Sequence, residues 1–411
     1  MHINFLPPNV FNNKMLNQPG VQQIVKYNDN DFKSDSFIKQ IKSDVAFKSS
    51  KNGVKIMTQP FGITKSGEPA FLFTLKNKNG AQVDISNFGA SIVSIKVPDK
   101  NNKIVDVLQG YNSVKDYDGT PVGHAGGTIG PCANKIGGGV FALNGNEYKL
   151  ECNKDNGKTH CHGGNAGFDV KNWDYKVLKN GVQFTLKKAD GEGGYPGDVK
   201  TTVSYTFDDN NKLKVNYKAV SDKDTILNLT NHAYFNLDGS EHTSENSVYN
   251  HIVEMPNSSK YTPVGQYALP TGEIASVEGT PMDFRKEKRI GDLINSDFEQ
   301  IKMASGFDQN YCVDGYDGKS LIEVAKVKSK ETGITLDVSS NLPGFQFYTA
   351  NHLGKSTQPN GREGKIYEKG SSFCVEPQFY PDAMAKFPEK PILHKGEEYD
   401  RTIVYDFNVV K

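Results

Sequence analysis

The chain of 411 residues lacks an excess of charge of either sign and lacks a long apolar run. Lysine plus arginine and aspartate plus glutamate both number 48, so the formal net charge is zero. This balance argues against a nucleic acid or an anionic membrane as a partner recognised through bulk charge. No apolar run approaches the roughly 20 residues of a membrane-spanning helix. The first residues show no basic segment followed by an apolar one, so we expect no membrane partner and no secretory signal.

Cysteines are few, odd in number and irregularly spaced, which favours reduced thiols over a disulfide framework. We therefore expect a cytoplasmic protein, with the five thiols at Cys132, Cys152, Cys161, Cys312 and Cys374. Cys152, His160, Cys161 and His162 invite a metal-binding interpretation. Their spacing matches no standard pattern, and adjacent ligands are awkward for one tetrahedral ion, so we predict no metal site.

The chain also lacks the signature motifs of three large enzyme classes at the polar positions considered below. These positions hold no Gly-x-Ser-x-Gly elbow, no phosphate-binding Walker loop and no dinucleotide fingerprint. The functional residues must therefore be sought among isolated ionisable groups rather than in a single long motif.

What is abundant is period-2 alternation of apolar residues, which is typical of half-buried strands. It predicts strands around 71–75, 93–97, 182–186, 203–207, 213–217 and 403–409, with the fourth and fifth joined as a hairpin through 208–211. Forty glycines and 19 prolines supply the turns that many strands require. The fold class is therefore predicted as all-β, a large antiparallel β-sandwich.

Residues 1–50 differ from the rest, because they are rich in asparagine, lysine, glutamine and aspartate. Phe37, Ile38, Ile41 and Val45 fall on one helical stripe, which predicts one amphipathic helix. A tail that merely decorates the surface is an equally good interpretation. We therefore divide the chain into an N-terminal extension, residues 1–50, and one β-sandwich domain, residues 51–411.

Two buried-looking ionisable residues are the first candidates for catalysis. His232 interrupts the apolar, strand-like run 227–237, and Glu376 lies between Val375 and Pro377. Burial of an imidazole or a carboxylate costs free energy unless the group is paired or used. His232 is either a hydrogen-bonded core histidine or a functional one, and together with Glu376 it makes a plausible acid–base pair.

Further candidates lie in glycine-rich segments. His162 directly precedes Gly163 and Gly164, so its imidazole can project into a cleft, although a loop histidine without a role is equally ordinary. Asn134 and Lys135 are bracketed by glycines and can donate hydrogen bonds to ligand oxygens. A turn before a strand is the simpler interpretation of that pair taken alone.

Asp283 and Gln346 are polar residues among apolar neighbours. Asp283 has Arg285 two residues on, so the two face the same side of a strand, and an ion pair is the simplest interpretation. The functional one is a carboxylate that accepts two hydroxyl hydrogens of a sugar. Gln346 lies between aromatic residues, which suits a site where rings cover C–H patches and an amide meets hydroxyls.

Taken in order, these segments resemble the aldose 1-epimerases, the galactose mutarotases. The resemblance runs from about Val54 to the C-terminus, and its motifs are Asn231-His-Ala-Tyr-Phe-Asn-Leu237, His162-Gly-Gly164, Gly193-Gly-Tyr-Pro-Gly197, Thr280-Pro-Met-Asp-Phe-Arg285 and Val375-Glu-Pro-Gln378. Each motif alone is weak, but five in order are strong. The resemblance implies a large β-sandwich of the galactose-mutarotase type, in agreement with the alternation.

The resemblance also implies roles for single residues. Glu376 matches the family's general base, His232 its general acid, and His162 a second active-site histidine near the ring and C1 oxygens. Asp283 matches a carboxylate that holds sugar hydroxyls, and Gln346 a further contact near the sugar. Asn134 and Lys135 match an asparagine–arginine pair that lines the site. The implied substrate is a free aldohexose such as galactose or glucose, and the implied reaction needs no cofactor.

The chain departs from the family at two positions. Lys135 stands where the family usually has arginine, and Pro131 stands where it has a second arginine. Lysine keeps the charge but loses the planar donor fork, and proline removes both a side-chain and a backbone donor. These changes bear on sugar affinity and preference. One alternative is a hexose-6-phosphate 1-epimerase, which would need a cluster of basic residues for the phosphate, and Pro131 and Lys135 move away from such a site. The other is a sugar-binding protein without turnover, which these two changes leave open. The sequence does not indicate an oligomeric state.

Overall fold

The computed structural model describes residues 54–118, 124–354 and 360–410. Strands dominate this part of the chain, and every pairing between named strands in it is antiparallel. The helices described are short, namely α2 (Val114–Tyr117), α3 (Ile290–Leu293), α4 (Glu299–Ala304) and α5 (Ala383–Lys386). The prediction of an all-β chain is confirmed, whereas the helix predicted within residues 1–50 lies outside the described residues.

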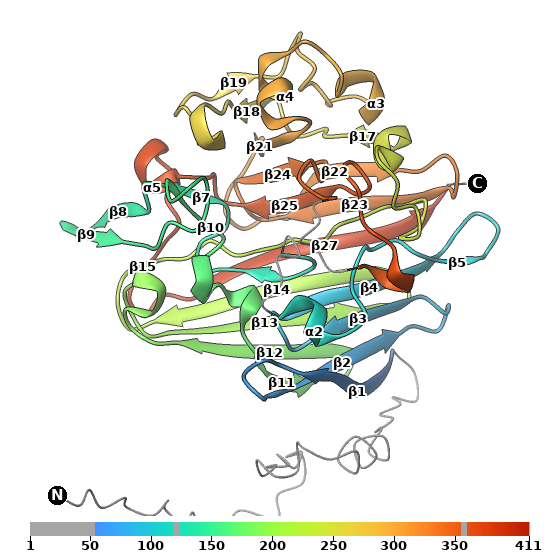
Figure 1. The fold of residues 1–411 in the computed structure, drawn as a ribbon, viewed down its shortest axis with the longest axis horizontal. Helices are drawn as coiled ribbons and strands as arrows, with labels where there is room; N and C mark the ends of the chain where they lie inside the picture. Colours follow the sequence, from blue (N-terminus) through green and yellow to red (C-terminus); the bar gives the residue numbers. More distant parts are fainter. Residues whose placement is uncertain (1–53, 119–123, 355–359, 411) are drawn as a thin grey trace, which may run out of the picture.

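The largest sheet has nine strands and runs through the middle of the molecule (Figure 1). Its order is β11 (Asp174–Val177), β12 (Gly181–Lys188), β13 (Val199–Phe207), β14 (Lys212–Ser221), β27 (Tyr399–Val409), β23 (Ile334–Ser340), β22 (Ile322–Lys328), β17 (Ile252–Glu254) and β20 (Lys288–Arg289). The predicted hairpin is present as β13 and β14, which pair from Val199 opposite Ser221 to Phe207 opposite Leu213. The alternation of apolar residues therefore predicted this central hairpin of the largest sheet correctly.

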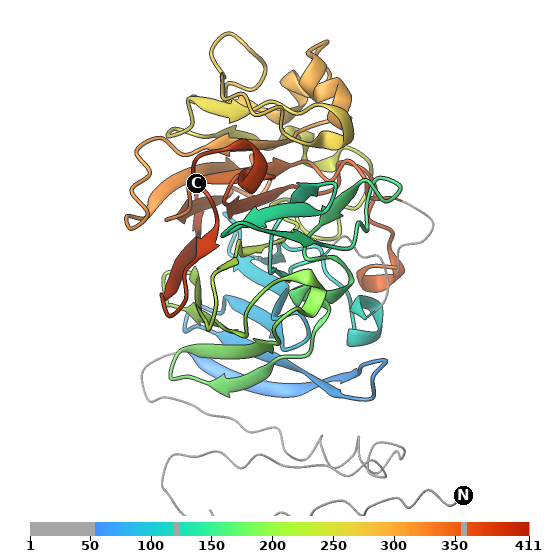
Figure 2. The ribbon, with the colours of Figure 1, turned by 90° about the vertical axis from the view of Figure 1, so that its left-hand side faces the viewer.

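Two five-stranded sheets accompany it. One is formed by β1 (Lys55–Ile63), β2 (Pro69–Lys76), β3 (Gln82–Ser86), β4 (Ser91–Pro98) and β5 (Ile104–Asp106). The other is formed by β19 (Ala275–Ser276), β18 (Lys260–Thr262), β21 (Asp308–Cys312), β24 (Gly344–Tyr348) and β25 (Cys374–Gln378). In both views of the ribbon the first lies at one end of the molecule and β18 and β19 lie at the other (Figures 1 and 2).

One apolar cluster joins the three sheets. It contains Phe73 of β2, Phe184 of β12 and Phe347 of β24, all buried. The rings of Phe73 and Phe184 meet edge to face with centroids 5.5 Å apart, which ties the β1–β5 sheet to the nine-stranded sheet. The sheets therefore pack face to face, as in a sandwich.

The segments between the sheets form short two-stranded antiparallel ladders. They pair β6 (Thr128–Ile129) with β16 (Thr230–Asn231), β7 (Lys135–Gly137) with β10 (Thr159–Cys161), β8 (Val140–Leu143) with β9 (Asn146–Lys149), and β15 (Thr225–Ile226) with β26 (Ile392–Leu393). The run 227–237 is thus less regular than its apolar sequence suggests, because only two of its residues form a strand. His232 lies directly after that strand, where its backbone exchanges hydrogen bonds with Gly126 and Gly127.

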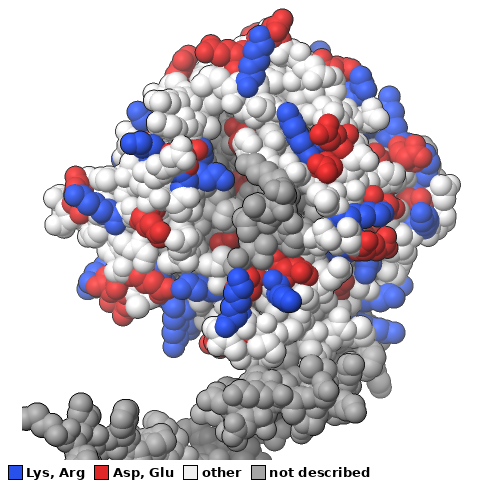
Figure 3. All heavy atoms as spheres, in the orientation of Figure 1, with Lys and Arg blue, Asp and Glu red and all other residues white. Residues whose placement is uncertain are grey.

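Charges of both signs are interspersed over the face seen in Figure 3, as expected for a chain without net charge. Within the described ranges, no helix is long and apolar enough to cross a membrane.

Phe235 anchors the 227–237 segment in the core, three residues after His232. Its ring lies 5.3 Å from that of Tyr405 and 5.8 Å from that of Phe373, and its backbone exchanges two hydrogen bonds with Phe373. We predict that Phe235→Ala lowers the free energy of unfolding by about 3–5 kcal/mol, because it leaves a cavity among aromatic rings. Urea denaturation followed by the fluorescence of Trp173 measures this loss.

Phe235→Leu is the matched control, because it keeps most of the volume and should cost less than the alanine variant. An alanine variant as stable as the wild type would contradict the packing described for Phe235.

Candidate active site

One face of the β18–β21–β24–β25 sheet collects polar side chains. Directly paired residues on antiparallel strands share a face, and Gln346 pairs with both Asn310 and Glu376. The alternate residues Phe345, Phe347 and Val375 belong to the apolar cluster on the opposite face. Period-2 geometry therefore places on one face Asp308, Asn310, Gln346, Tyr348, Cys374 and Glu376.

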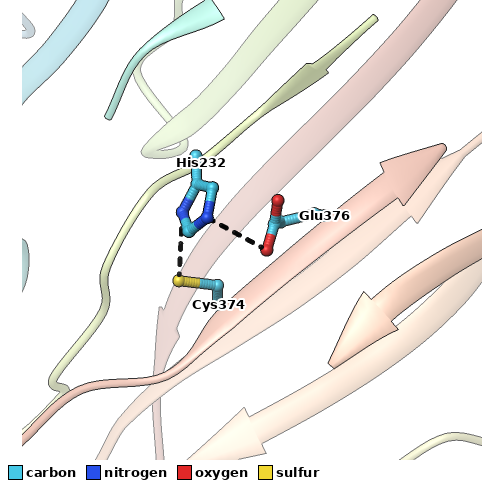
Figure 4. A group of neighbouring side chains, drawn as sticks. All are labelled: His232, Cys374 and Glu376. Carbon is cyan, nitrogen blue, oxygen red and sulfur yellow. Dashed lines mark hydrogen bonds and ion pairs between the residues drawn. The ribbon is translucent and has the colours of Figure 1, made fainter. Parts of the chain in front are cut away.

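His232 approaches this face and stands between two residues of β25 (Figure 4). Its Nε2 lies 3.6 Å from Glu376 Oε1, and its Nδ1 lies 3.6 Å from Cys374 Sγ. The side chains of His232 and Glu376 are 6% and 3% exposed. Tyr234 stacks on the imidazole with ring centroids 4.9 Å apart, so the ring is held from several sides. The structure therefore places His232 and Glu376 side by side, and their acid–base roles stay a prediction.

Burial sets the protonation of this pair. It raises the pKa of the Glu376 carboxyl well above its usual range, and the nearby Asp308 adds to the effect. Burial also lowers the pKa of His232 to about 3, with a further contribution from His124. Both groups therefore favour their neutral forms. This differs from the ordinary values for glutamate and histidine, which would give a carboxylate near neutral pH.

Glu376 also holds an unused acceptor. Its Oε2 is buried and has no hydrogen-bond partner, and the same holds for the side-chain amide of Asn310 and for Oε1 of Gln378. Buried polar atoms in proteins are rarely left unpaired, and such exceptions concentrate at functional sites. These atoms provide the face with unused hydrogen-bonding capacity for a polar ligand.

His162 joins the pair from another segment, with its ring centroid 5.4 Å from that of His232. The backbone N–H of Asn134 donates to Nδ1 of His162 at 3.2 Å, and the carbonyl of Asn134 accepts from the His162 backbone. Because Nδ1 accepts, the neutral ring carries its proton on Nε2 and is a donor there. Burial, with the nearby His124 and His232, lowers the pKa of His162 well below its usual value. His162 is thus a neutral hydrogen-bond donor.

Local backbone conformation explains why glycine follows His162. His162 and Asn134 both adopt left-handed conformations, with φ of 52° and 62°. Gly163, also left-handed, passes so close to Gly130 that a Cβ would lie 2.0 Å from its carbonyl oxygen. Only glycine fits there, so the His-Gly-Gly motif fixes the place of the imidazole.

Lys135 lies beside this segment, but its ammonium is already engaged. Nζ donates to Asp155 Oδ2 at 2.9 Å and to the carbonyl of Tyr267. The side chain is 16% exposed. Lys135 therefore ties the segments of β7, Asp155 and Tyr267 together, and its predicted contact with a ligand needs these bonds to yield.

Gln346 lies on the polar face, directly opposite Glu376. Its Nε2 donates to Oδ1 of Asp308 at 2.8 Å, and its Oε1 accepts from Gln378 at 3.3 Å. Burial raises the pKa of Asp308, although the hydrogen bond from Gln346 opposes this. Asp308 is thus a carboxyl group of the site, and the sequence reasoning missed it.

Asp283 does not belong to this cluster, contrary to the sequence prediction. Its carboxylate is gripped by Arg285 through two hydrogen bonds of 2.9 Å. The neighbouring Met282 and Phe284 contact Tyr311 and Phe347, which point to the apolar face of the sheet. The Asp283 segment therefore packs on the side opposite the polar face, and the ion pair is the correct interpretation.

His124 is a second residue that sequence reasoning missed. Its ring centroid lies 4.6 Å from that of His162 and 5.9 Å from that of His232. It lies in a turn among glycines, where no periodicity marks it. Asp308 could have been found, because it stands two residues before Asn310 in a strand whose partner carries Gln346.

Metal binding has one geometric candidate among the described residues, the group His232, Cys374 and Glu376, whose ligand atoms lie within 4.8 Å of one another. His232 turns opposite ring nitrogens toward the other two, so the three cannot bind one ion through the atoms that now face each other. His160 of the cysteine–histidine cluster bonds instead to the Glu151 carbonyl and the Tyr195 hydroxyl, at 2.6 and 2.7 Å.

Comparison with known proteins bears directly on this arrangement. The family described as aldose 1-epimerase matches residues 72–406. Galactose mutarotases of Bos taurus and Homo sapiens are each 40% identical, over 80% of this chain and 91% of theirs. An aldose 1-epimerase of Escherichia coli is 33% identical, over 84% of this chain and 97% of its own.

Solved structures of aldose epimerases have a similar fold. An aldose epimerase homologue from C. elegans superimposes with a TM-score of 0.72 at 30% identity, over 81% of this chain and 97% of that one. A galactose 1-epimerase from Lactobacillus acidophilus superimposes with a TM-score of 0.74 at 29% identity, over 87% of this chain and all of that one. The predicted galactose-mutarotase type of sandwich is confirmed.

The electrostatics of the buried pair can be tested by titration. We predict that the imidazole of His232 stays neutral as the pH falls from 8 to 4 and gains a proton only near pH 3, because protonation would place a charge in a desolvated site. Nitrogen NMR of labelled histidines measures this, with His232→Gln to assign the signal and circular dichroism to verify folding. A midpoint near the ordinary value of about 6.5 would refute the desolvated pair.

Proposed function

This chain belongs to the aldose 1-epimerase family and is a mutarotase, an isomerase that interconverts the α- and β-anomers of an aldose, and we propose that Glu376 and His232 carry out its proton transfers. The observation that supports this assignment most directly is the buried pair itself. A carboxyl group and an imidazole stand 3.6 Å apart on a face lined with hydrogen-bonding side chains.

The proposed reaction moves two protons and breaks one bond. Glu376, as the carboxylate, takes the proton of the C1 hydroxyl, while His232, as the imidazolium, gives a proton to the ring oxygen. The bond between C1 and the ring oxygen breaks, and the sugar opens to an aldehyde. Rotation about C1–C2 followed by reclosure gives the other anomer, with the roles of acid and base reversed.

The pair needs only one shared proton for this cycle. With the ring closed, the reacting form is carboxylate plus imidazolium. After ring opening the proton resides on Glu376 and His232 is neutral. Burial favours the neutral form of each group, so it favours the protonation state that accompanies the open-chain aldehyde. Either form has one acid and one base, so the same pair can act in opening and in closure.

Sugar binding is assigned to the polar side chains around the pair. We propose that Nε2–H of His162 donates to the ring or C1 oxygen, and that Asp308 and Gln346 hold hydroxyl groups further along the ring. Asn134 holds His162 in place through two backbone hydrogen bonds. Galactose and glucose are the proposed substrates, and the names of the mutarotases to which the chain is similar support galactose.

We assign catalysis to residues 51–411 and treat residues 1–50 as an extension. We also place the protein in the cytoplasm. The five cysteines support this location, because all are free thiols and four of them are buried.

Removing the base tests the assignment. We predict that Glu376→Gln lowers the enzymatic rate by about 10²- to 10⁴-fold, because the amide cannot accept the C1 proton. Polarimetry on freshly dissolved α-D-galactose and α-D-glucose, corrected for the spontaneous reaction, measures the rate and ranks the two sugars. Wild-type turnover in the variant would remove Glu376 from the mechanism. A folded wild type that accelerates neither sugar would overturn the proposed substrates.

Two aspartates distinguish the observed site from the one expected from sequence. We predict that Asp308→Asn lowers kcat/KM for galactose by about 10-fold or more, because a hydrogen bond to a charged group contributes about 1.5–3 kcal/mol. Asp283→Asn is the matched control and should leave kcat/KM unchanged, since Asp283 lies with Arg285 on the opposite face of the sheet. The reverse pattern would restore the sequence prediction and reject the role given to Asp308.

A further inference from the structure

A third histidine completes a triangle of imidazoles in the active site. The ring of His124 lies 4.6 Å from His162 and 5.9 Å from His232, and those two lie 5.4 Å from each other. The rings of His124 and His232 are nearly parallel, with an interplanar angle of 28°. A sugar that contacts His162 and His232 must therefore come close to His124.

His124 also has the closest carboxyl partner of the three. Its Nδ1 lies 2.7 Å from Asp169 Oδ2, compared with 3.6 Å between His232 Nε2 and Glu376. A carboxylate only accepts, so Nδ1 of His124 carries a proton and Nε2 remains as the second polar atom of the ring. The Asp169 side chain is 7% exposed, whereas that of His124 is 31% exposed. The imidazole is thus anchored on its buried side and accessible on the other.

The three histidines differ in their surroundings. Burial lowers the pKa of His162 and of His232, and in both cases His124 is the next largest influence in that direction. Lys154 acts on both in the same direction, and Glu376 contacts His232. His124 instead faces Asp169, whose Oδ2 accepts a hydrogen bond from its Nδ1.

We propose that His124 is a third active-site histidine, which contacts an oxygen of the bound sugar through Nε2, and that Asp169 is the residue that positions it. This inference rests on the proposed mutarotase function. With Nδ1 donating to Asp169, Nε2 of His124 is the ring atom left to meet the sugar oxygen, beside the imidazoles of His162 and His232.

The first test is kinetic, in the same polarimetric assay. We predict that His124→Ala lowers kcat/KM for galactose by about 10- to 100-fold, the effect of losing one charge-assisted hydrogen bond. Asp169→Asn should lower it less, and the double variant should be no worse than His124→Ala, because both act through one contact. His394, whose Nδ1 lies 3.2 Å from Asp224 on the surface, is the matched control, and His394→Ala should have no effect.

A structural role for the pair predicts something different. If His124 and Asp169 only held the turn before Ala125, both variants would lower the melting temperature and leave kcat/KM of the folded protein unchanged. That result would overturn the inference. A folded wild-type protein without mutarotase activity would instead reject the proposed function, so the two failures are distinguishable.

A second test leaves the ring of His124 intact. In the Glu376→Gln variant, which we expect to turn sugar over slowly, nitrogen NMR of the histidines should show the His124 signals shift when galactose is added. The signals of His394 should stay in place. Shifts at His162 and His232 without a shift at His124 would overturn the contact.

Discussion

The structure of the site depends on one constraint, the desolvation of the His232–Glu376 pair. Burying an isolated carboxylate or imidazolium is costly, and the attraction between the two groups only partly offsets that cost. The pair therefore remains neutral overall by sharing one proton. The carboxyl group of the pair also keeps hydrogen-bonding capacity unused. Oε2 of Glu376 has no partner, and a ligand that supplies hydroxyl groups is the natural complement of such a face.

The alternation of side chains along the strands of one sheet places several of these groups on the same face. Alternation on β21, β24 and β25 separates polar from aromatic residues, so Glu376 and Gln346 share a face while Val375 and Phe347 anchor the opposite face in the core. His232 comes from a different segment, whose regular pairing ends just before it. Phe235 holds that segment in the aromatic core, so the two halves of the acid–base pair have independent supports.

Sequence alone predicted the strands well, because alternation is a local signal that survives without knowledge of the fold. It also selected His232, Glu376, His162 and Gln346, which the structure brings together. It failed where the answer depends on which side of a sheet a segment packs. Asp283 and Asp308 are both acidic residues among aromatic neighbours, yet the first lies against the apolar face and the second on the polar face. His124 stands in a glycine-rich turn, where no period exists, and only the folded chain reveals its neighbours.

The departures from the family at Lys135 and Pro131 acquire a physical meaning in this setting. An arginine at either position would bring a permanent charge with a planar fork of donors. Lys135 keeps a charge, but Asp155 and the Tyr267 carbonyl already use its donors. A third imidazole, that of His124, is held against Asp169 at 2.7 Å. An imidazole can both donate and accept hydrogen bonds, so the proposed contact of His124 with the sugar adds a polar group to a site in which the donors of Lys135 are already used.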